Sequence, residues 1–171
     1  MRERLPSSPE VRGRFATARL SAEGGRLQLH DIALTFLNDP VYGPNLAAAR
    51  VTREQILHAG KIQTDRTSQP DDVYIPPANV NTLVSSAARL AEARRATSIG
   101  DPDIFKAMFS VNGGGLEALI ILNEDPRGLS ETILTGRVEH DRDYHEERRA
   151  EIKAMLERNA VSARSSDERA A

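Results

Sequence analysis

The sequence contains no cysteine. This absence excludes disulfide bonds, zinc sites with thiolate ligands and thiol chemistry, and it favours a reducing compartment. Tryptophan is also absent, and aromatic residues make up only 4% of the 171 residues. Large ligand pockets lined by aromatic rings are therefore not expected.

Long hydrophobic runs are missing as well. The longest apolar run, Ala118 to Leu122, is far shorter than the roughly 20 residues that a membrane helix needs. Charge of one sign does not dominate either, since 23 basic residues face 25 acidic ones. We therefore expect a protein without membrane insertion, located in the cytoplasm or within an assembled particle, whose overall charge demands no polyanionic partner.

Helical patterns fill the first third of the chain. Ser8-Pro9-Glu10 combines a capping side chain, a proline suited to the first helical position and a carboxylate for the first turn, which predicts a helix over 9–22. The next helix carries apolar residues at i, i+3, i+4, i+7 and i+8, the spacing of one buried face. These residues are Leu29, Ile32, Ala33, Phe36 and Leu37.

Capping signals predict further helices downstream. A short helical piece is expected over 45–50. Thr52 and Gln55 have the spacing of a capping box, so a helix should begin there and end near Gly60. Asn79 can cap a helix over 80–98, and Asp101-Pro102-Asp103 predicts another over 102–111. The intervening segment 61–78 contains three prolines and is predicted to be the longest loop.

The segment 116–123 fits either a buried helix or a buried strand. We favour a helix, which makes the protein mainly α: a compact domain of about five to six helices. The alternative is an α+β fold with a small hairpin over 116–138, around a turn at Asp125 to Gly128. Ser130 is predicted to cap a long helix that ends near Arg158. The expected organisation is an arm over 1–8, a core over 9–128, a long helix over 129–159 and a polar tail over 160–171.

Two segments offer ligand chemistry. Potential metal ligands gather in one short stretch, at Glu139, His140, Asp141, Asp143, His145, Glu146 and Glu147. Its two histidines are five residues apart rather than four, so they do not share the helix face of a paired zinc site, and a solvated helix surface is favoured. The loop Asn112 to Gly115 offers backbone N–H groups to an anion, but no phosphate-binding motif follows it. A hinge or a close backbone crossing is favoured there.

Arg89, Arg94 and Arg95 are possible nucleic-acid contacts if they converge on one face. They alternate with acidic residues, and no aromatic residue lies nearby to stack on a base, so a solvated surface is favoured. His30 and His58 are isolated on helices without a visible nucleophile. We assign no catalytic, cofactor-binding or metal-binding residue.

Two short resemblances carry no function over to this chain. The segment Thr52 to Leu57 resembles the first helix of TetR-type regulators over fewer than ten residues, but the proline-containing loop replaces the spacing of a helix–turn–helix. The stretch Val51 to Thr97 is similar to small helical phage head–tail adaptors only in the order of two helices and an acidic loop.

The leading hypothesis is a non-enzymatic structural or interaction subunit of a larger assembly, such as a phage or virus particle or a secretion machine. Ile152, Met155 and Leu156 form an apolar patch at the far end of the predicted long helix, and we expect a second copy, another subunit or a fold-back contact of the chain itself to cover it. The alternative is a nucleic-acid-associated accessory or regulatory protein. A metal-dependent enzyme centred on His140 and His145 is the third hypothesis.

Overall fold

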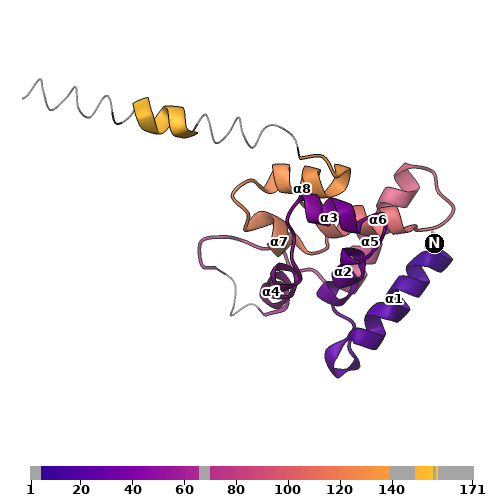
Figure 1. Ribbon diagram of the computed structural model, residues 1–171. Helices are drawn as coiled ribbons and strands as arrows, with labels where there is room; N and C mark the ends of the chain where they lie inside the picture. The colour runs from indigo at the N-terminus through magenta and orange to yellow at the C-terminus, as the bar shows by residue number, and fades with distance from the viewer. Residues whose placement is uncertain (1–4, 66–69, 139–148, 156, 158–171) are drawn as a thin grey trace, which may run out of the picture. The chain divides into compact units, whose positions relative to one another are not determined.

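The computed structural model describes residues 5–65, 70–138, 149–155 and 157. The chain divides into two compact units, residues 1–137 and 138–171. Within the described residues, the first unit holds eight α-helices and one short 3₁₀ helix (Figure 1). The helices are α1 (Pro9–Ser21), η1 (Glu23–Gly25), α2 (Leu29–Leu37), α3 (Gly43–Ala48), α4 (Arg53–Thr64), α5 (Val80–Ala93), α6 (Asp101–Phe109), α7 (Glu117–Ile121) and α8 (Pro126–Thr135).

The prediction of a mainly α protein is confirmed. The segment 116–138 forms α7 and α8 rather than a hairpin, and extended pairing within the described ranges is limited to an isolated bridge. The predicted count of five to six helices is too low. Short helices such as α3 and α7, of six and five residues, hold together through contacts with neighbouring helices rather than through their own length.

The predicted helix starts are confirmed where a side chain caps the backbone. The Ser8 hydroxyl accepts a hydrogen bond from the Val11 N–H at the start of α1. At the start of α4, the Gln55 N–H donates to the Thr52 hydroxyl and the Thr52 N–H donates to the Gln55 side chain, at 3.2 and 2.9 Å. Asn79 caps α5. These bonds satisfy N–H groups that a helix leaves unpaired at its first turn.

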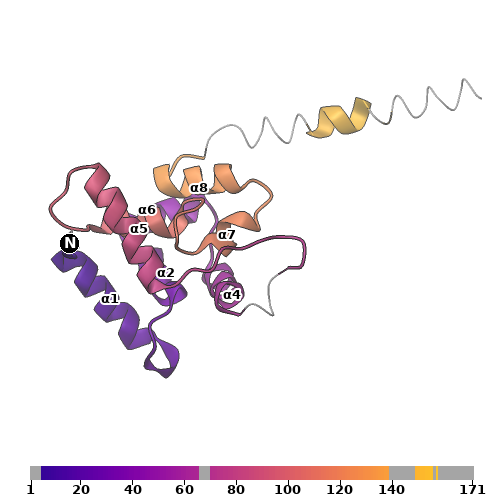
Figure 2. The same cartoon turned by 180° about the vertical axis from the view of Figure 1, so that it is seen from behind.

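The core is built around α2, which contacts α1, α3, α4 and α6. Figure 2 shows α2 between α1 and α4. The predicted apolar face is buried except at its end: Ile32, Ala33 and Phe36 are fully enclosed, whereas Leu37 is partly buried. The Phe36 ring lies 5.1 Å from that of Phe105 and 5.3 Å from that of Tyr42, both edge to face. Phe36, Tyr42, Phe105 and Phe109 thus form one aromatic cluster, where edge-to-face contacts add to burial.

Arg14 joins α1 to this core. Its guanidinium donates two hydrogen bonds to Asp101 on α6, one to Asp39 after α2, and two to Thr35, and it lies 3.9 Å above the Phe36 ring. Burial alone would lower the pKa of Arg14, but the hydrogen bonds to Asp101 and Asp39 outweigh it and raise that pKa. The guanidinium therefore stays charged and fully bonded at the junction of three elements.

Asp101 is available for this contact because it does not cap α6. The N-cap is Gly100, whose N–H donates to the Asp103 carboxylate at 2.8 Å. The predicted helix is therefore right and its cap is wrong by one residue. The predicted inward residues of α6 are all buried: Ile104, Phe105, Met108 and Phe109.

Two helix ends differ from the prediction by four residues or more, while α3 and α6 each end two residues early. α4 continues through Gly60 to Thr64. Gly60 does not end the helix, since its backbone is not left-handed, and its missing side chain leaves room for the His30 ring. α5 ends at Ala93, before the predicted Ser98. The loop is correspondingly shorter: 70–79 carries no helix or strand, and 66–69 lie outside the described residues.

Gln63 fixes the loop 70–79 against α4 and α7. This buried side chain donates to the Pro76 carbonyl at 2.5 Å and accepts from the Ala118 N–H at 3.0 Å. One amide therefore bridges α4, the loop and the start of α7, and it satisfies backbone groups that would otherwise be buried without a partner.

The predicted long C-terminal helix is wrong at its start and is interrupted. Asp125 accepts a hydrogen bond from the Gly128 N–H and Pro126 begins α8, so the expected turn is the first turn of a helix. Ser130 lies inside α8, where its hydroxyl donates to the Phe109 carbonyl at 2.8 Å. Gly136, with φ of 69°, ends α8 in a left-handed conformation that favours glycine. The second unit contains a separate helical segment over 149–155.

The predicted N-terminal arm is paired with a distant part of the chain. The Ser8 N–H donates to the Ile99 carbonyl at 2.9 Å, and the Ile99 N–H donates to the Pro6 carbonyl at 2.8 Å. This parallel bridge links the residues before α1 to the connection between α5 and α6. Residues 1–4 of the arm lie outside the described residues.

Candidate functional site

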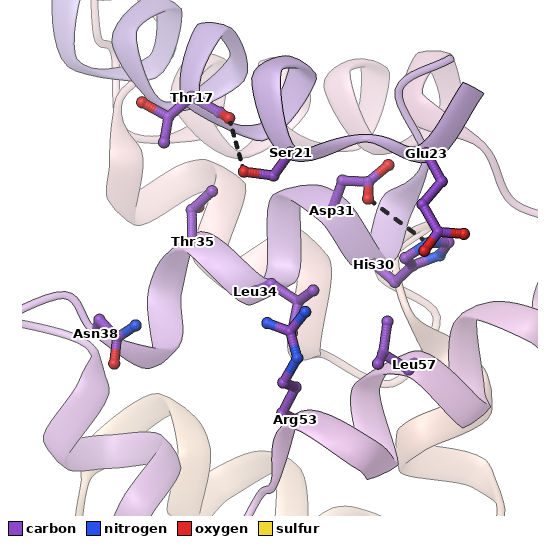
Figure 3. A pocket seen from close by; sticks show the side chains of 10 residues that line it. All are labelled: Thr17, Ser21, Glu23, His30, Asp31, Leu34, Thr35, Asn38, Arg53 and Leu57. Carbon is purple, nitrogen blue, oxygen red and sulfur yellow. Dashed lines mark hydrogen bonds and ion pairs between the residues drawn. The ribbon is translucent and has the colours of Figure 1, made fainter. Parts of the chain in front are cut away.

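A groove of about 610 Å³ lies between α1, α2 and the beginning of α4. Figure 3 shows its polar side chains: His30 and Asp31 from the first turn of α2, Glu23 from η1 and Arg53 from α4. Leu57 contributes an apolar wall and is 38% exposed. The groove thus combines an imidazole, two carboxylates and a guanidinium beside apolar surface.

Asp31 lies beside His30 in the groove. One oxygen of the buried Asp31 carboxylate accepts the Gln28 N–H at 2.8 Å and so caps α2, while the other lies 3.6 Å from His30 Nε2. The Nδ1 atom of His30 is buried and makes no hydrogen bond to the described residues. A Cβ atom at residue 60 would lie 2.5 Å from that nitrogen, so glycine at this position of α4 is required for the ring to fit.

The hydroxyl groups of the groove are already bonded within their own helices. Thr17 donates to the Gly13 carbonyl, Ser21 to the Thr17 carbonyl and Thr35 to the Ile32 carbonyl. Among the described residues, none of them donates to His30. The charged side chains of the groove can exchange hydrogen bonds with a polar partner. In the described part of the chain, the groove does not show the contact between a nucleophile and a base that covalent catalysis requires.

His30, which the sequence shows isolated on a helix, lies 3.6 Å from the Asp31 carboxylate. The groove itself was missed. Its residues come from α1, η1, α2 and α4, and only the adjacent His30-Asp31 pair at a helix start gives a local signal that polar groups gather there.

The three candidate arginines for nucleic-acid contact do not share one environment. Arg94 donates two hydrogen bonds to Asp103, at 2.9 and 2.7 Å. Burial alone would raise the pKa of Asp103, but the bonds from Arg94 and from the Gly100 N–H outweigh it and lower that pKa. Arg95 follows in a left-handed backbone conformation with φ of 60°. Arg89 lies five residues before Arg94, about 140° away around the helix. It lines a cavity between α5 and α6 that is separate from the groove.

Two of the three residues predicted to form an interface are exposed on the helical segment 149–155. Ile152 is 47% exposed and Met155 is 51% exposed, while Leu156 lies outside the described residues. The acidic and histidine-rich stretch from Glu139 to Glu147 also lies outside them. In the part of the chain that the structure describes, no group of three or more His, Asp or Glu side chains is placed to hold a metal ion.

No helix within the described ranges combines the length and the apolar character that crossing a bilayer requires. Comparisons with protein-family models, with curated proteins and with solved structures give no match for this chain.

Proposed function

We propose that the protein is a non-enzymatic structural or interaction subunit of a larger multi-protein assembly, such as a phage or virus particle or a secretion machine. It acts through helix-mediated contacts made by its C-terminal unit, in the cytoplasm or within the assembled particle. The observation that carries the proposal is the exposure of Ile152 and Met155 on the helical segment 149–155.

The two side chains are three residues apart, so they project from the same side of the helix. Each leaves about half of its surface in water, and covering that surface would contribute on the order of 1 kcal/mol per side chain. The partner is a second copy of the chain or another protein subunit that lays an apolar surface on this side. A stable interface of roughly 1,200 Å² or more is larger than two side chains supply, so the contact extends to their neighbours.

The test compares two charge-matched variants of the full chain. Ile152→Glu with Met155→Glu places two negative charges on the apolar side. Ala150→Glu with Lys153→Gln changes the net charge by the same amount at exposed positions of the same segment. Solution mass is measured by light scattering after size-exclusion chromatography at two protein concentrations.

We expect the wild type and the control to associate and the Ile152/Met155 variant to remain monomeric. If the wild type is monomeric, co-purification with subunits of the source assembly replaces the mass measurement, and the same variant is expected to lose its partner. Equal association or equal capture by all three proteins contradicts the proposal.

The alternative is a nucleic-acid-associated role, favoured by the exposure of both Arg89 and Arg95 on α5 and just after it. Gel retardation that weakens steeply with salt and is lost when both arginines are replaced by Gln would support this role. The absence of any retardation at low salt would exclude it.

A further inference from the structure

A second cavity, of about 300 Å³, lies between α5, α6 and the loop that follows α6. The two helices make the most extensive helix contact of the body and run next to one another in Figures 1 and 2. Arg89 of α5 and Lys106 of α6 line this cavity, and no carboxylate lines it.

Arg89 and Lys106 differ from Arg14 and Arg94 in their bonding. Arg14 and Arg94 are held by aspartates at 2.6 to 2.7 Å. In the described ranges, neither Arg89 nor Lys106 lies within ion-pair distance of a carboxylate, and both residues are exposed. The nearby Asp103 carboxyl, whose pKa the charge of Lys106 helps to lower, is bonded to Arg94 and does not line the cavity. Two positive charges at one cavity favour a doubly charged anion.

The neutral walls of the cavity favour a ligand with an organic group. Leu90 and Val111 line it together with Ser110. The Ser110 hydroxyl is buried and makes no hydrogen bond to the described residues. A buried hydroxyl without a partner costs free energy unless water or a ligand satisfies it, so the cavity offers a free donor beside its two cations.

The glycine loop shapes this cavity without supplying its positive charge. A Cβ atom on Gly113 would lie 2.2 Å from the Ala107 carbonyl oxygen, so only glycine allows the loop to cross the end of α6 at this distance. The N–H groups of Gly113 and Gly114 donate to the Ser110 carbonyl and the Glu117 carboxylate. They are therefore not free for an anion, and the close backbone crossing favoured for these glycines agrees with the structure.

We infer that this cavity binds a phosphate monoester of a small organic molecule. The phosphate dianion lies between Arg89 and Lys106, the Ser110 hydroxyl donates to it, and the organic group lies against Leu90 and Val111. Arginine suits two oxygens of one phosphate at once, and lysine acts as a point charge beside it. The site is independent of the apolar side chains in the C-terminal unit.

The test uses phenyl phosphate as the probe and the amide resonances of Ser110 and Gly113 as the readout. We expect saturable shifts with phenyl phosphate, none with phenol, and weaker binding of inorganic phosphate. Arg89→Gln and Lys106→Gln should each lower the affinity about tenfold or more, since each removes a charge-assisted hydrogen bond. Ser110→Ala should weaken binding without lowering the thermal stability.

Arg95→Gln is the matched control, because it removes the same charge from an exposed position outside the cavity. Unchanged affinity in this variant supports the cavity as the site. An equal loss in Arg95→Gln and Arg89→Gln would show attraction to general positive charge and overturn the inference. The absence of saturable shifts with phenyl phosphate would overturn it as well.

Discussion

Arg14 and Asp101 are 87 residues apart in the chain and are joined by two parallel hydrogen bonds, Nε to Oδ1 at 3.0 Å and Nη2 to Oδ2 at 2.6 Å. The pair matters because α1 has little apolar surface to bury. Of its thirteen residues, only Val11 and Ala18 are buried. Phe15 packs against the core but is only partly buried, so the fixed charge geometry of Arg14 adds to the few apolar contacts that hold α1 in place.

Replacing this arginine should uncouple α1 from the body. Arg14→Met keeps a long apolar side chain but leaves Asp39 and Asp101 without their cation, and both side chains are less than one-fifth exposed. We expect the free energy of unfolding to fall by about 3 kcal/mol, the order found when one partner of a buried ion pair is removed. Arg12→Met, at an exposed position of the same helix, is the control for urea unfolding. Equal losses in both variants would contradict this role of Arg14.

Acid should weaken the fold through two aspartates. Burial favours a raised pKa for Asp39 and for Asp103, but hydrogen bonds from Arg14 and Arg94, respectively, and from backbone N–H groups outweigh it, so both pKa values lie below the ordinary value of 3.8. A lowered folded-state pKa contributes stability that is present above the unfolded value and is lost as the pH falls through the folded value. We expect little change in unfolding free energy from pH 7 to 5 and a decline below about pH 4.

Asp103→Asn isolates one of these contributions. Unfolding free energies at pH 7, 5, 4 and 3 should show a lower value at pH 7 and a smaller decline with acid than the wild type. Asp72→Asn, at an exposed position, should leave the pH profile unchanged. Parallel profiles for the wild type and Asp103→Asn would show that this carboxylate does not govern acid sensitivity.

Two glycines should respond in opposite directions to the same substitution. A Cβ atom at Gly115 would lie 2.4 Å from the Met108 Cα atom, whereas one at Gly13 has no neighbour within 4 Å. Gly115→Ala should destabilise the protein by about 2 kcal/mol or more through forced backbone movement. Gly13→Ala, inside α1, should stabilise it by about 0.5 to 1 kcal/mol. Thermal unfolding measures both, and a neutral Gly115→Ala would contradict the close crossing.

Gln63 should protect a backbone group far from it in the sequence. Gln63→Met fills a similar volume but removes the acceptor of the Ala118 N–H and the donor to the Pro76 carbonyl. We expect a loss of about 2 kcal/mol, since two buried groups lose their partners, and faster hydrogen exchange at the Ala118 amide. Lys61→Met, at an exposed position of α4, should change neither quantity.

Local signals in the sequence predict where helices begin. Ser8, Thr52 and Asn79 cap helices as expected, because a cap depends only on residues within one turn. Asp125-Pro126 has the same cap-and-proline pattern, but these residue types are equally typical of a turn, so the sequence alone does not distinguish the two structures there. Gly136 was missed as a helix end because apolar residues on both sides of it suggested one continuous helix.

The groove and the cavity were beyond local reasoning. Lys106 lies on α6 and Arg89 on α5, and only the contact between these two helices brings the two side chains to one cavity. The sequence grouped Arg89 with Arg94 and Arg95 because they are neighbours in the chain. Periodicity indicates which residues face inward on one helix, but it carries no information on which helices meet.

The bridge between the N-terminal arm and Ile99 also affects the order in which contacts form while the chain is being synthesised. Residues Pro6 and Ser8 leave the ribosome about ninety residues before their partner, and so does Arg14 before Asp101. A chain segment cannot gain stability from a contact whose other half does not yet exist. The contact of α1 with α6 therefore waits until Asp101 has been made, whereas its contacts with α2 become available as soon as the chain through Asp39 has been made.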